Sequence, residues 1–215
     1  MNDNLNHNGS ADQFLVSELG LATKLDPSLE PLINNIGYPE PRIRSASFET
    51  LLHIIVSQQL STKAAAAISS RLSGSCNGEI TWRKILNRSE AQLKACGLSI
   101  QKINYARSLA LSLKNKELEL DQLIHMDTDE VLSTLMKIKG FGRWSAEIYA
   151  MFALQHRDIY PAGDLALRIA LGKHFGLGQE PDEATTRKMS ELWQPHRSAV
   201  ALLMWKFYGS TTLGK

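Results

Sequence analysis

A single carboxylate, Asp164, is the strongest candidate for chemistry in this chain. It ends the segment Pro-Ala-Gly-Asp at residues 161–164 and stands directly before a predicted helix. A carboxylate at such a junction can stabilise the positive charge that develops at a sugar carbon when a glycosidic bond breaks, or deprotonate an attacking water. The alternative is structural, because Asp before a helix is also a good N-cap, and the residues alone favour the cap.

A glycine-rich turn precedes Asp164 in the chain. Gly140 and Gly142 accept a positive φ or a close backbone approach, so the chain can reverse within a few residues. Neither glycine covers the amides at the start of the next predicted helix, and bare amides at a helix N-terminus bind anions. Three cations flank the turn, and no acid lies among them. The turn is therefore predicted to hold a DNA phosphate without reading a base, and the residues expected to do so are Lys137, Lys139, Gly140, Phe141, Gly142 and Arg143.

Helices must position both features. Apolar residues at helical spacing predict a helix over about residues 128–137, and a second helix over 143–154 completes a helix-hairpin-helix. Asp26-Pro27 is expected to open the second of two short helices within residues 11–37. Period-two alternation persists nowhere, so the fold is predicted to be all-α. Further helices are expected at residues 48–58, 61–74, 82–86, 90–96, 101–113, 164–175, 182–193 and 198–208.

Composition narrows the class of protein. At 215 residues, with 43% hydrophobic residues, the chain can bury a core as one globular unit or two small intertwined lobes. Its net charge of +2 means that any nucleic-acid-binding surface must be local. Cys76 and Cys96 are too few for a disulfide framework or a four-cysteine iron–sulfur cluster.

Other classes of site are not expected. No apolar run is long enough to span a membrane, and no basic-then-apolar leader opens the chain. The histidines show no ligand spacing, so no catalytic metal is expected. Residues 1–10 are rich in Asn and are predicted to be disordered.

Several motifs together resemble one family. The glycine turn followed by Arg143-Trp144, the Pro-x-x-Asp at residues 161–164 and the Trp-x-Pro-x-Arg-Ser at residues 193–198 stand in the order found in helix-hairpin-helix (HhH-GPD) DNA glycosylases. The chain is most similar to their alkylation-damage branch, the 3-methyladenine DNA glycosylase II type, and within it to fission-yeast members. The resemblance covers residues 48–208. It implies a two-lobed helical fold with a central lobe of about residues 45–140, a second lobe from the N- and C-terminal segments, and the hairpin, residues 128–154, at their seam.

The resemblance also implies roles for single residues. Asp164 matches the family's catalytic carboxylate. Relatives that also cut the strand carry a Lys where this chain has Trp144, and an indole cannot form a Schiff base, so a monofunctional, water-using enzyme is implied. No cofactor is required. The family hairpin often holds a monovalent cation, Na⁺ or K⁺, through main-chain carbonyls, which here belong to Met136, Ile138 and Phe141.

Two more groups of residues match family positions. The first is the minor-groove wedge, which fills the gap left by a base drawn out of the stack. It comprises Gln58, Gln59, Leu60 and Ser61. The alternative for these residues is a polar turn between two helices, with Ser61 as the cap of the second helix. The second is the base pocket of Trp144, Ile148 and Trp205, where aromatic rings attract a cationic alkylpurine. Bacterial enzymes carry a Tyr at the position of Ile148, and core packing is the alternative for both tryptophans.

Three functions follow as hypotheses. The first is a monofunctional DNA glycosylase that hydrolyses the N-glycosidic bond of alkylated purines, 3-methyladenine above all, in base excision repair. The second is a homologue with weak or lost activity that binds abasic or distorted DNA without excising a base. The third, a helical protein–protein adaptor, is disfavoured because it leaves the cationic turn unused. The expected partner is double-stranded DNA with an alkylated base or an abasic site, bound by a monomer. The resemblance to fission-yeast members implies a nuclear protein if the source is a eukaryote, and a cytoplasmic protein otherwise.

Overall fold

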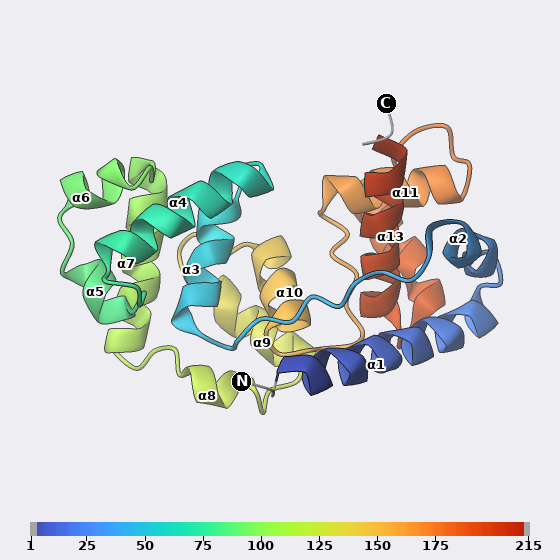
Figure 1. The fold of residues 1–215 in the computed structure, drawn as a ribbon, viewed down its shortest axis with the longest axis horizontal. Coiled ribbons are helices and arrows are strands. Elements are labelled where there is room, and N and C mark those ends of the chain that lie inside the picture. The colour runs from blue at the N-terminus through green and yellow to red at the C-terminus, as the bar shows by residue number, and fades with distance from the viewer. Residues whose placement is uncertain (1–3, 213–215) are drawn as a thin grey trace. The chain divides into compact units, whose positions relative to one another are not determined.

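The computed structural model describes residues 4–212, and the side chains of residues 12–211. All regular elements in this range are helices, and no strand occurs in it (Figure 1). The predicted all-α fold is confirmed. Among the described helices, none has both the length and the apolar character needed to cross a bilayer.

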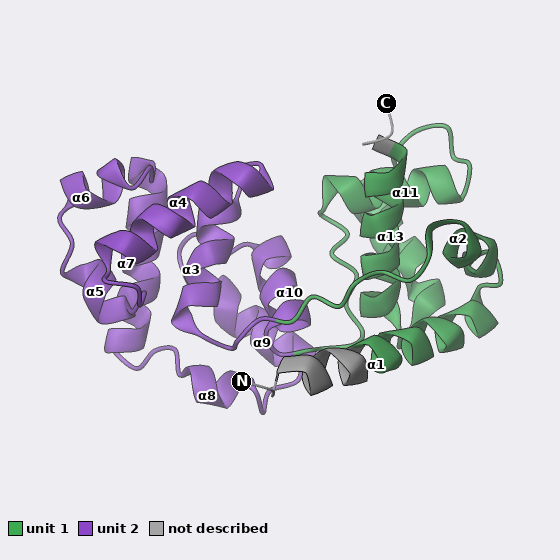
Figure 2. Ribbon diagram, in the orientation of Figure 1, with its two compact units in different colours: residues 1–43, 155–215 green, residues 44–154 purple. Residues whose placement is uncertain are grey.

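The chain divides into two compact units (Figure 2). One, the central unit, comprises residues 44–154; the other, the terminal unit, joins residues 1–43 to residues 155–215. The predicted central lobe ended near residue 140, whereas the structure keeps both arms of the hairpin in the central unit. The reason is packing, because the arm after the turn lies against the arm before it and against the helix at residues 48–57.

In the central unit, α3 (Phe48–Ser57) supplies much of the core. Its side chains are buried on nearly every face, as the run Leu51, Leu52, Ile54, Ile55 and Val56 requires. The helices α4, α7 and α10 pack against it, and α9 packs against α10. The remaining bounds are α4 (Thr62–Ser75), α5 (Trp82–Leu86), α6 (Glu90–Ala95), α7 (Ile100–Lys114), α8 (Leu120–Leu123), α9 (Thr128–Met136) and α10 (Arg143–Phe152).

In the terminal unit, α13 (Arg197–Thr212) packs against α11, α1 and α2. Fully buried Trp193 lies beside it, with its ring stacked on Phe175 and tilted against Tyr160. Its Nε1 donates to the Asp26 carboxylate at 2.8 Å. Trp193 is thus a core residue, as expected. The other elements are α1 (Asn4–Leu25), α2 (Leu29–Ile36), α11 (Leu165–His174), α12 (Glu183–Met189) and the 3₁₀ helix η1 (Ser190–Trp193).

The N-terminal segment differs from the prediction of disorder. Residues 1–3 lie outside the described residues, but α1 begins at Asn4 and so includes most of the segment predicted to be disordered. Once a helix is nucleated, each added residue gains one hydrogen bond, and no proline interrupts this stretch. Asp26 also differs from its expected role, because α2 begins only at Leu29 and Asp26 instead accepts hydrogen bonds from the backbone and hydroxyl of Ser28.

Candidate functional site

The glycine turn joins α9 and α10 as predicted. α9 opens with a capping box in which Asp127 and Glu130 bond reciprocally to backbone amides. At the other side of the turn, Gly142 is the N-cap of α10 and provides no side-chain hydrogen bond, so the first amides of α10 have no side-chain cap. Buried Ile138 and Phe141 anchor the turn in the core, and the Phe141 amide donates to the Ile138 carbonyl at 3.0 Å. The turn therefore presents backbone amides on a fixed base.

Gly140 and Gly142 differ in backbone conformation and in the space around the α-carbon. Gly140 has φ +95°, and a Cβ placed on it would lie 2.2 Å from Cγ of Tyr105. Gly142 has φ −89°, and a Cβ there would meet nothing within 4 Å. Gly140 is therefore required by the backbone and by Tyr105 on α7, which sequence reasoning missed, while Gly142 leaves the helix start bare.

The charges around the turn are less uniform than the sequence indicated. Arg143 Nε donates to the carboxylate of Glu147 at 3.0 Å, one helical turn later, and this carboxylate is buried. No described acid forms an ion pair with Lys137 or Lys139, both of which are exposed. The free positive charge of the turn is therefore concentrated on the two lysines.

The predicted wedge is a tight turn between α3 and α4. Gln59 has φ +56° and is exposed, and the neighbouring Leu60 side chain is 41% exposed. Ser61 is the N-cap of α4, and its hydroxyl accepts a hydrogen bond from the Ala64 amide at 3.2 Å. This is the capping role that the alternative interpretation of the turn predicted. Gln59, Leu60 and Ser61 are thus all exposed, and of the three it is Ser61 whose hydroxyl caps a helix.

Gln58 has a different environment from its neighbours. Its side-chain amide donates to the Gly140 carbonyl at 2.9 Å and to the Ser145 hydroxyl at 3.0 Å, so it joins the wedge turn to the hairpin. Lys102 holds the other side of the same turn, its amine donating to the carbonyls of Val56 at 2.6 Å and Gln58 at 2.8 Å. Burial lowers the pKa of Lys102. Sequence reasoning missed Lys102 because its partners lie more than forty residues away, at separations of 46 and 44.

In the terminal unit, Asp164 is the N-cap of α11. Its Oδ1 accepts from the Leu167 amide at 3.2 Å and from the Trp205 indole Nε1 at 3.2 Å. The Asp164 carboxylate is half-buried. The burial of neighbouring Tyr160 raises the pKa of the Tyr160 hydroxyl, and the negative charge of Asp164 raises it further. The cap favoured from the residues alone is therefore present, and it coexists with a second hydrogen bond that fixes the carboxylate from α13.

The expected pocket residues lie on two different helices. Trp144 and Ile148 are half-buried on α10, one helical turn apart, in the central unit. Trp205 is half-buried on α13 in the terminal unit, and the guanidinium of Arg42 lies over its ring, 5.3 Å from the centroid. Arg42 was not identified from the sequence, because no local pattern links it to Trp205.

The cation expected at the main-chain carbonyls of Met136, Ile138 and Phe141 stays a prediction. The Ile138 carbonyl already accepts one hydrogen bond, from the Phe141 amide, and a carbonyl oxygen has a second lone pair. Oxygen ligands of this kind suit hard cations. Among the described residues, no three His, Cys, Asp or Glu side chains gather as a metal site.

A family model covers most of this geometry. The model of HhH-GPD superfamily base excision DNA repair proteins matches residues 52–195, a range that includes the wedge turn, both arms of the hairpin and Asp164. The chain belongs to the HhH-GPD superfamily. The family predicted from the sequence is confirmed. It was predicted from the order of the hairpin, Arg143-Trp144, the Pro-x-x-Asp segment and the Trp-x-Pro-x-Arg-Ser segment.

Fission-yeast proteins are among the similar members of the HhH-GPD superfamily. DNA-3-methyladenine glycosylase 1 of Schizosaccharomyces pombe is 31% identical over 188 residues, covering 85% of this chain and 82% of the relative. The alkylbase DNA glycosidase-like protein mag2 of the same organism is 28% identical, covering 86% of this chain and 89% of the relative. The structure of S. pombe Mag1 in complex with abasic DNA matches with a TM-score of 0.80 at 31% identity, covering 88% of this chain and 94% of that one.

Proposed function

We propose that this protein is a monofunctional DNA glycosylase that hydrolyses the N-glycosidic bond of alkylated purines in base excision repair. The observation that carries the proposal is the Asp164 carboxylate, whose Oδ1 is fixed at the start of α11 by the Leu167 amide and the Trp205 indole. The named S. pombe relative, DNA-3-methyladenine glycosylase 1, supports 3-methyladenine as the substrate class. The expected partner is double-stranded DNA, bound by a monomer.

The proposed role of Asp164 is electrostatic. When the base leaves, positive charge develops at C1′ of the deoxyribose, and a carboxylate held in place stabilises this charge without reorganising. The same group can orient or deprotonate the attacking water. Trp144 follows the hairpin arginine where a Schiff-base lysine would be needed, so hydrolysis rather than strand cleavage is proposed.

The proposed DNA grip lies in the central unit. The uncapped amides of α10, with Lys137 and Lys139 beside them, would bind a backbone phosphate, and Gln59 and Leu60 would enter the minor groove. The carbonyls of Met136, Ile138 and Phe141 would hold a monovalent cation, which supplies positive charge to that phosphate when bound.

The base pocket would recognise charge as well as shape. An N-alkylated purine is cationic, and each aromatic contact favours it over a normal base by about 0.5–2 kcal/mol. Trp144 in the central unit and Trp205 in the terminal unit are each proposed as an aromatic surface for such a base, and Ile148 makes the surface beside Trp144 more apolar. Nuclear residence, expected from yeast relatives, is part of the same proposal.

A second candidate is a protein that binds abasic or distorted DNA and releases no base. One of the similar relatives carries the name alkylbase DNA glycosidase-like protein, and the similar Mag1 structure is a complex with abasic DNA. Ser61, committed to capping α4, adds no bulk to the wedge. This arrangement favours holding a gap already present in the duplex over opening one.

One paired assay tests both candidates. Release of 3-methyladenine and of ethenoadenine is measured for the wild type, for Asp164→Asn and for Asp182→Asn, alongside binding to an abasic-site analogue. Asp182 is the matched control because it caps α12 in the same way, accepting from the Thr185 amide at 2.7 Å. Asn preserves a cap at both positions, so only the loss of the Asp164 charge should slow base release, by about 10²–10⁴-fold.

The outcomes separate the candidates. Release lost in Asp164→Asn and kept in Asp182→Asn supports the glycosylase. No release by the wild type, with tight abasic binding by all three proteins, supports the binding protein. Neither release nor abasic binding by the wild type overturns both.

A further inference from the structure

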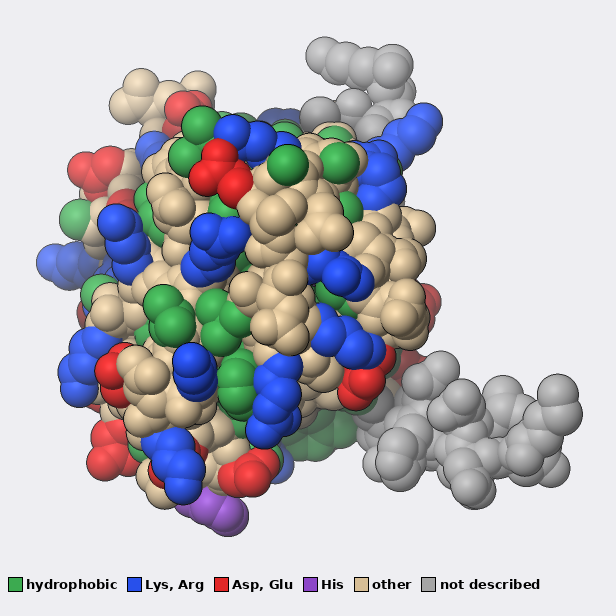
Figure 3. Space-filling model, turned by 90° about the vertical axis from the view of Figure 1, so that its left-hand side faces the viewer, with side chains coloured by type: hydrophobic (Ala, Val, Ile, Leu, Met, Phe, Trp, Pro, Cys, Tyr) green, Lys and Arg blue, Asp and Glu red, His purple; other side chains and the backbone are tan. Residues whose placement is uncertain are grey.

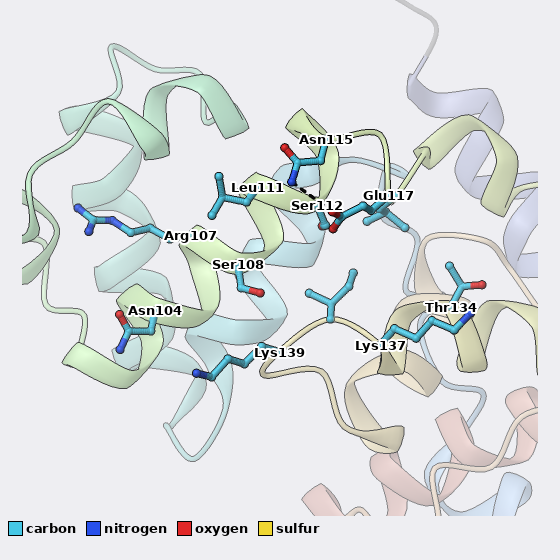
Figure 4. A pocket seen from close by; sticks show the side chains of 12 residues that line it. Asn104, Arg107, Ser108, Leu111, Ser112, Asn115, Glu117, Thr134, Lys137 and Lys139 are labelled. Carbon is cyan, nitrogen blue, oxygen red and sulfur yellow. Dashed lines mark hydrogen bonds between the residues drawn. The ribbon is translucent and has the colours of Figure 1, made fainter.

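A polar groove lies beside the hairpin, on the side of α7. Its volume is about 830 Å³, and it lies entirely within the central unit (Figure 4). One wall is a stripe of α7 that includes Asn104, Ser108 and Leu111; the other is the segment that leads into the glycine turn, with Lys137 and Lys139. The groove is therefore continuous with the turn proposed to hold a phosphate.

The two lysines lie at opposite ends of this groove. In Figure 4, Lys139 is directed toward the Asn104 end of α7, while Lys137 is directed toward Thr134. Neither forms an ion pair with an acid in the described part of the chain. A linear polyanion lying along the groove would meet one ammonium group at each end.

Few acidic residues lie in the segments that form the groove. The chain has no acidic residue between Glu90 and Glu117, a stretch that contains all of α7, and none between Glu130 and Glu147, a stretch that contains the turn. The one acid in the groove lining, Glu117, accepts a hydrogen bond from Asn115 at 3.2 Å. The view of the central unit from the side of α5 and α6 shows Lys and Arg spread across the middle of the face and acids mostly toward its edges (Figure 3).

The net positive charge of the groove lining favours an anionic ligand. The groove lining includes three cations, Arg107, Lys137 and Lys139, against one acid, which gives +2, the same as the net charge of the whole chain. A concave surface of one sign concentrates the field and attracts an oppositely charged chain. Its small polar side chains can donate hydrogen bonds to phosphate and sugar oxygens without reading a base.

We propose that this groove binds the sugar–phosphate backbone of the duplex flanking the lesion, as a second phosphate-binding surface beyond the hairpin amides. The inference rests on the proposed DNA-binding function. It assigns the α7 wall, which no family motif marks, to DNA binding. Because phosphate contacts carry no sequence or lesion information, the groove contributes equally to damaged and undamaged DNA.

The test adds one negative charge to the α7 wall. Ser108→Glu places it in the groove, and Asn104→Asp adds the same charge at an exposed position of the groove wall. Ser70→Glu, on the exposed face of α4 and outside the groove, is the matched control. Thermal unfolding checks that each variant is folded, and affinity for a duplex with an abasic-site analogue and for its undamaged counterpart is measured from low to high salt.

Both groove variants are expected to bind about tenfold more weakly at low salt, on both duplexes, because the added charge repels phosphate. The slope of log K against log salt should become less steep by about 0.9 for each phosphate that the variant no longer binds. Ser70→Glu should retain the wild-type affinity and slope. In base release, the groove variants should raise KM and leave kcat unchanged, because contacts to the backbone flanking the lesion bind the substrate and the transition state equally.

Failure of the groove and failure of the glycosylase proposal differ. Wild-type affinity and slope in folded Ser108→Glu and Asn104→Asp overturn the groove while base release stands. The expected slopes without any base release overturn the glycosylase and keep the groove. A wild type that binds neither duplex overturns both.

Discussion

The proposed task of the central unit depends on backbone groups, whereas that of the terminal unit depends on a side chain. In the central unit the proposed phosphate grip would be made by backbone amides, in a turn whose shape depends on Gly140, where φ is +95° and a Cβ would clash with Tyr105. In the terminal unit the proposed chemistry would depend on one side chain, Asp164, which accepts hydrogen bonds from the Leu167 amide and the Trp205 indole. A backbone site is vulnerable to any change of conformation, while a carboxylate site is vulnerable to the loss of one charge.

This difference predicts which substitutions damage each unit. Conservative side-chain changes should spare the central unit's binding unless they move its backbone. In the terminal unit, an isosteric change of a carboxylate should be enough to remove a function or a buried interaction. Three predictions test the contrast, from the largest effect to the smallest.

Gly140→Ala should have the largest effect on stability. The new Cβ would lie 2.2 Å from Tyr105 Cγ at a positive φ, so the turn must shift, with a loss of about 2–4 kcal/mol in the free energy of unfolding. Affinity for damaged and undamaged duplex should fall together. Denaturant unfolding and duplex binding measure this. Gly142→Ala is the control, with an expected change in stability below about 1 kcal/mol, because its Cβ meets nothing within 4 Å. Equal losses in the two variants would contradict the assigned role of Gly140.

Asp26→Asn should have the next largest effect, confined to the terminal unit's core. Burial alone would raise the pKa of Asp26, but hydrogen bonds from Ser28 and Trp193 and the nearby His174 together lower it. A lowered folded-state pKa stabilises the fold above the unfolded-state pKa, and this stability is lost as pH falls through the folded-state value. The wild type should therefore lose stability below about pH 4.

The Asp26→Asn protein should lose less stability over that acid range. At neutral pH it should be less stable by about 1–3 kcal/mol, because the Trp193 indole loses a charged acceptor. Chemical unfolding at a series of pH values measures both effects, with Asp12→Asn, at an exposed site on α1, as the control. An unchanged acid profile in Asp26→Asn would show that Asp26 does not carry this stability.

Lys102→Met should have the smallest effect and sharpen the role of the wedge turn. It removes the hydrogen bonds to the carbonyls of Val56 and Gln58 at the end of α3. The free energy of unfolding should therefore fall by about 1 kcal/mol. As a positioning residue, Lys102 should affect base extrusion, read by the fluorescence of a 2-aminopurine beside the lesion, more than affinity for undamaged duplex. Lys114→Met, at the exposed end of α7, is the control. A parallel fall in extrusion and in undamaged binding would mean that Lys102 supports only the fold.

The local features of the site were readable from residues close in sequence. Asp164 was favoured as a helix cap because the acceptor and the amide it caps are three residues apart, and the structure has this bond. The glycine turn and its flanking cations were likewise visible as a short pattern. The pairing of Arg143 with Glu147 follows from helical spacing and could have been found, since residues four apart share one face.

The sequence by itself determined the all-α class, the family and the order of turn and carboxylate, because helix periodicity, capping and glycine turns act over a few residues. Only the tertiary structure decided that Gln58 faces the hairpin 82 residues away, that Tyr105 requires Gly140, and that Trp205 holds Asp164 from 41 residues away. Such contacts depend on how helices pack, and packing joins residues whose spacing in the chain carries no local signal.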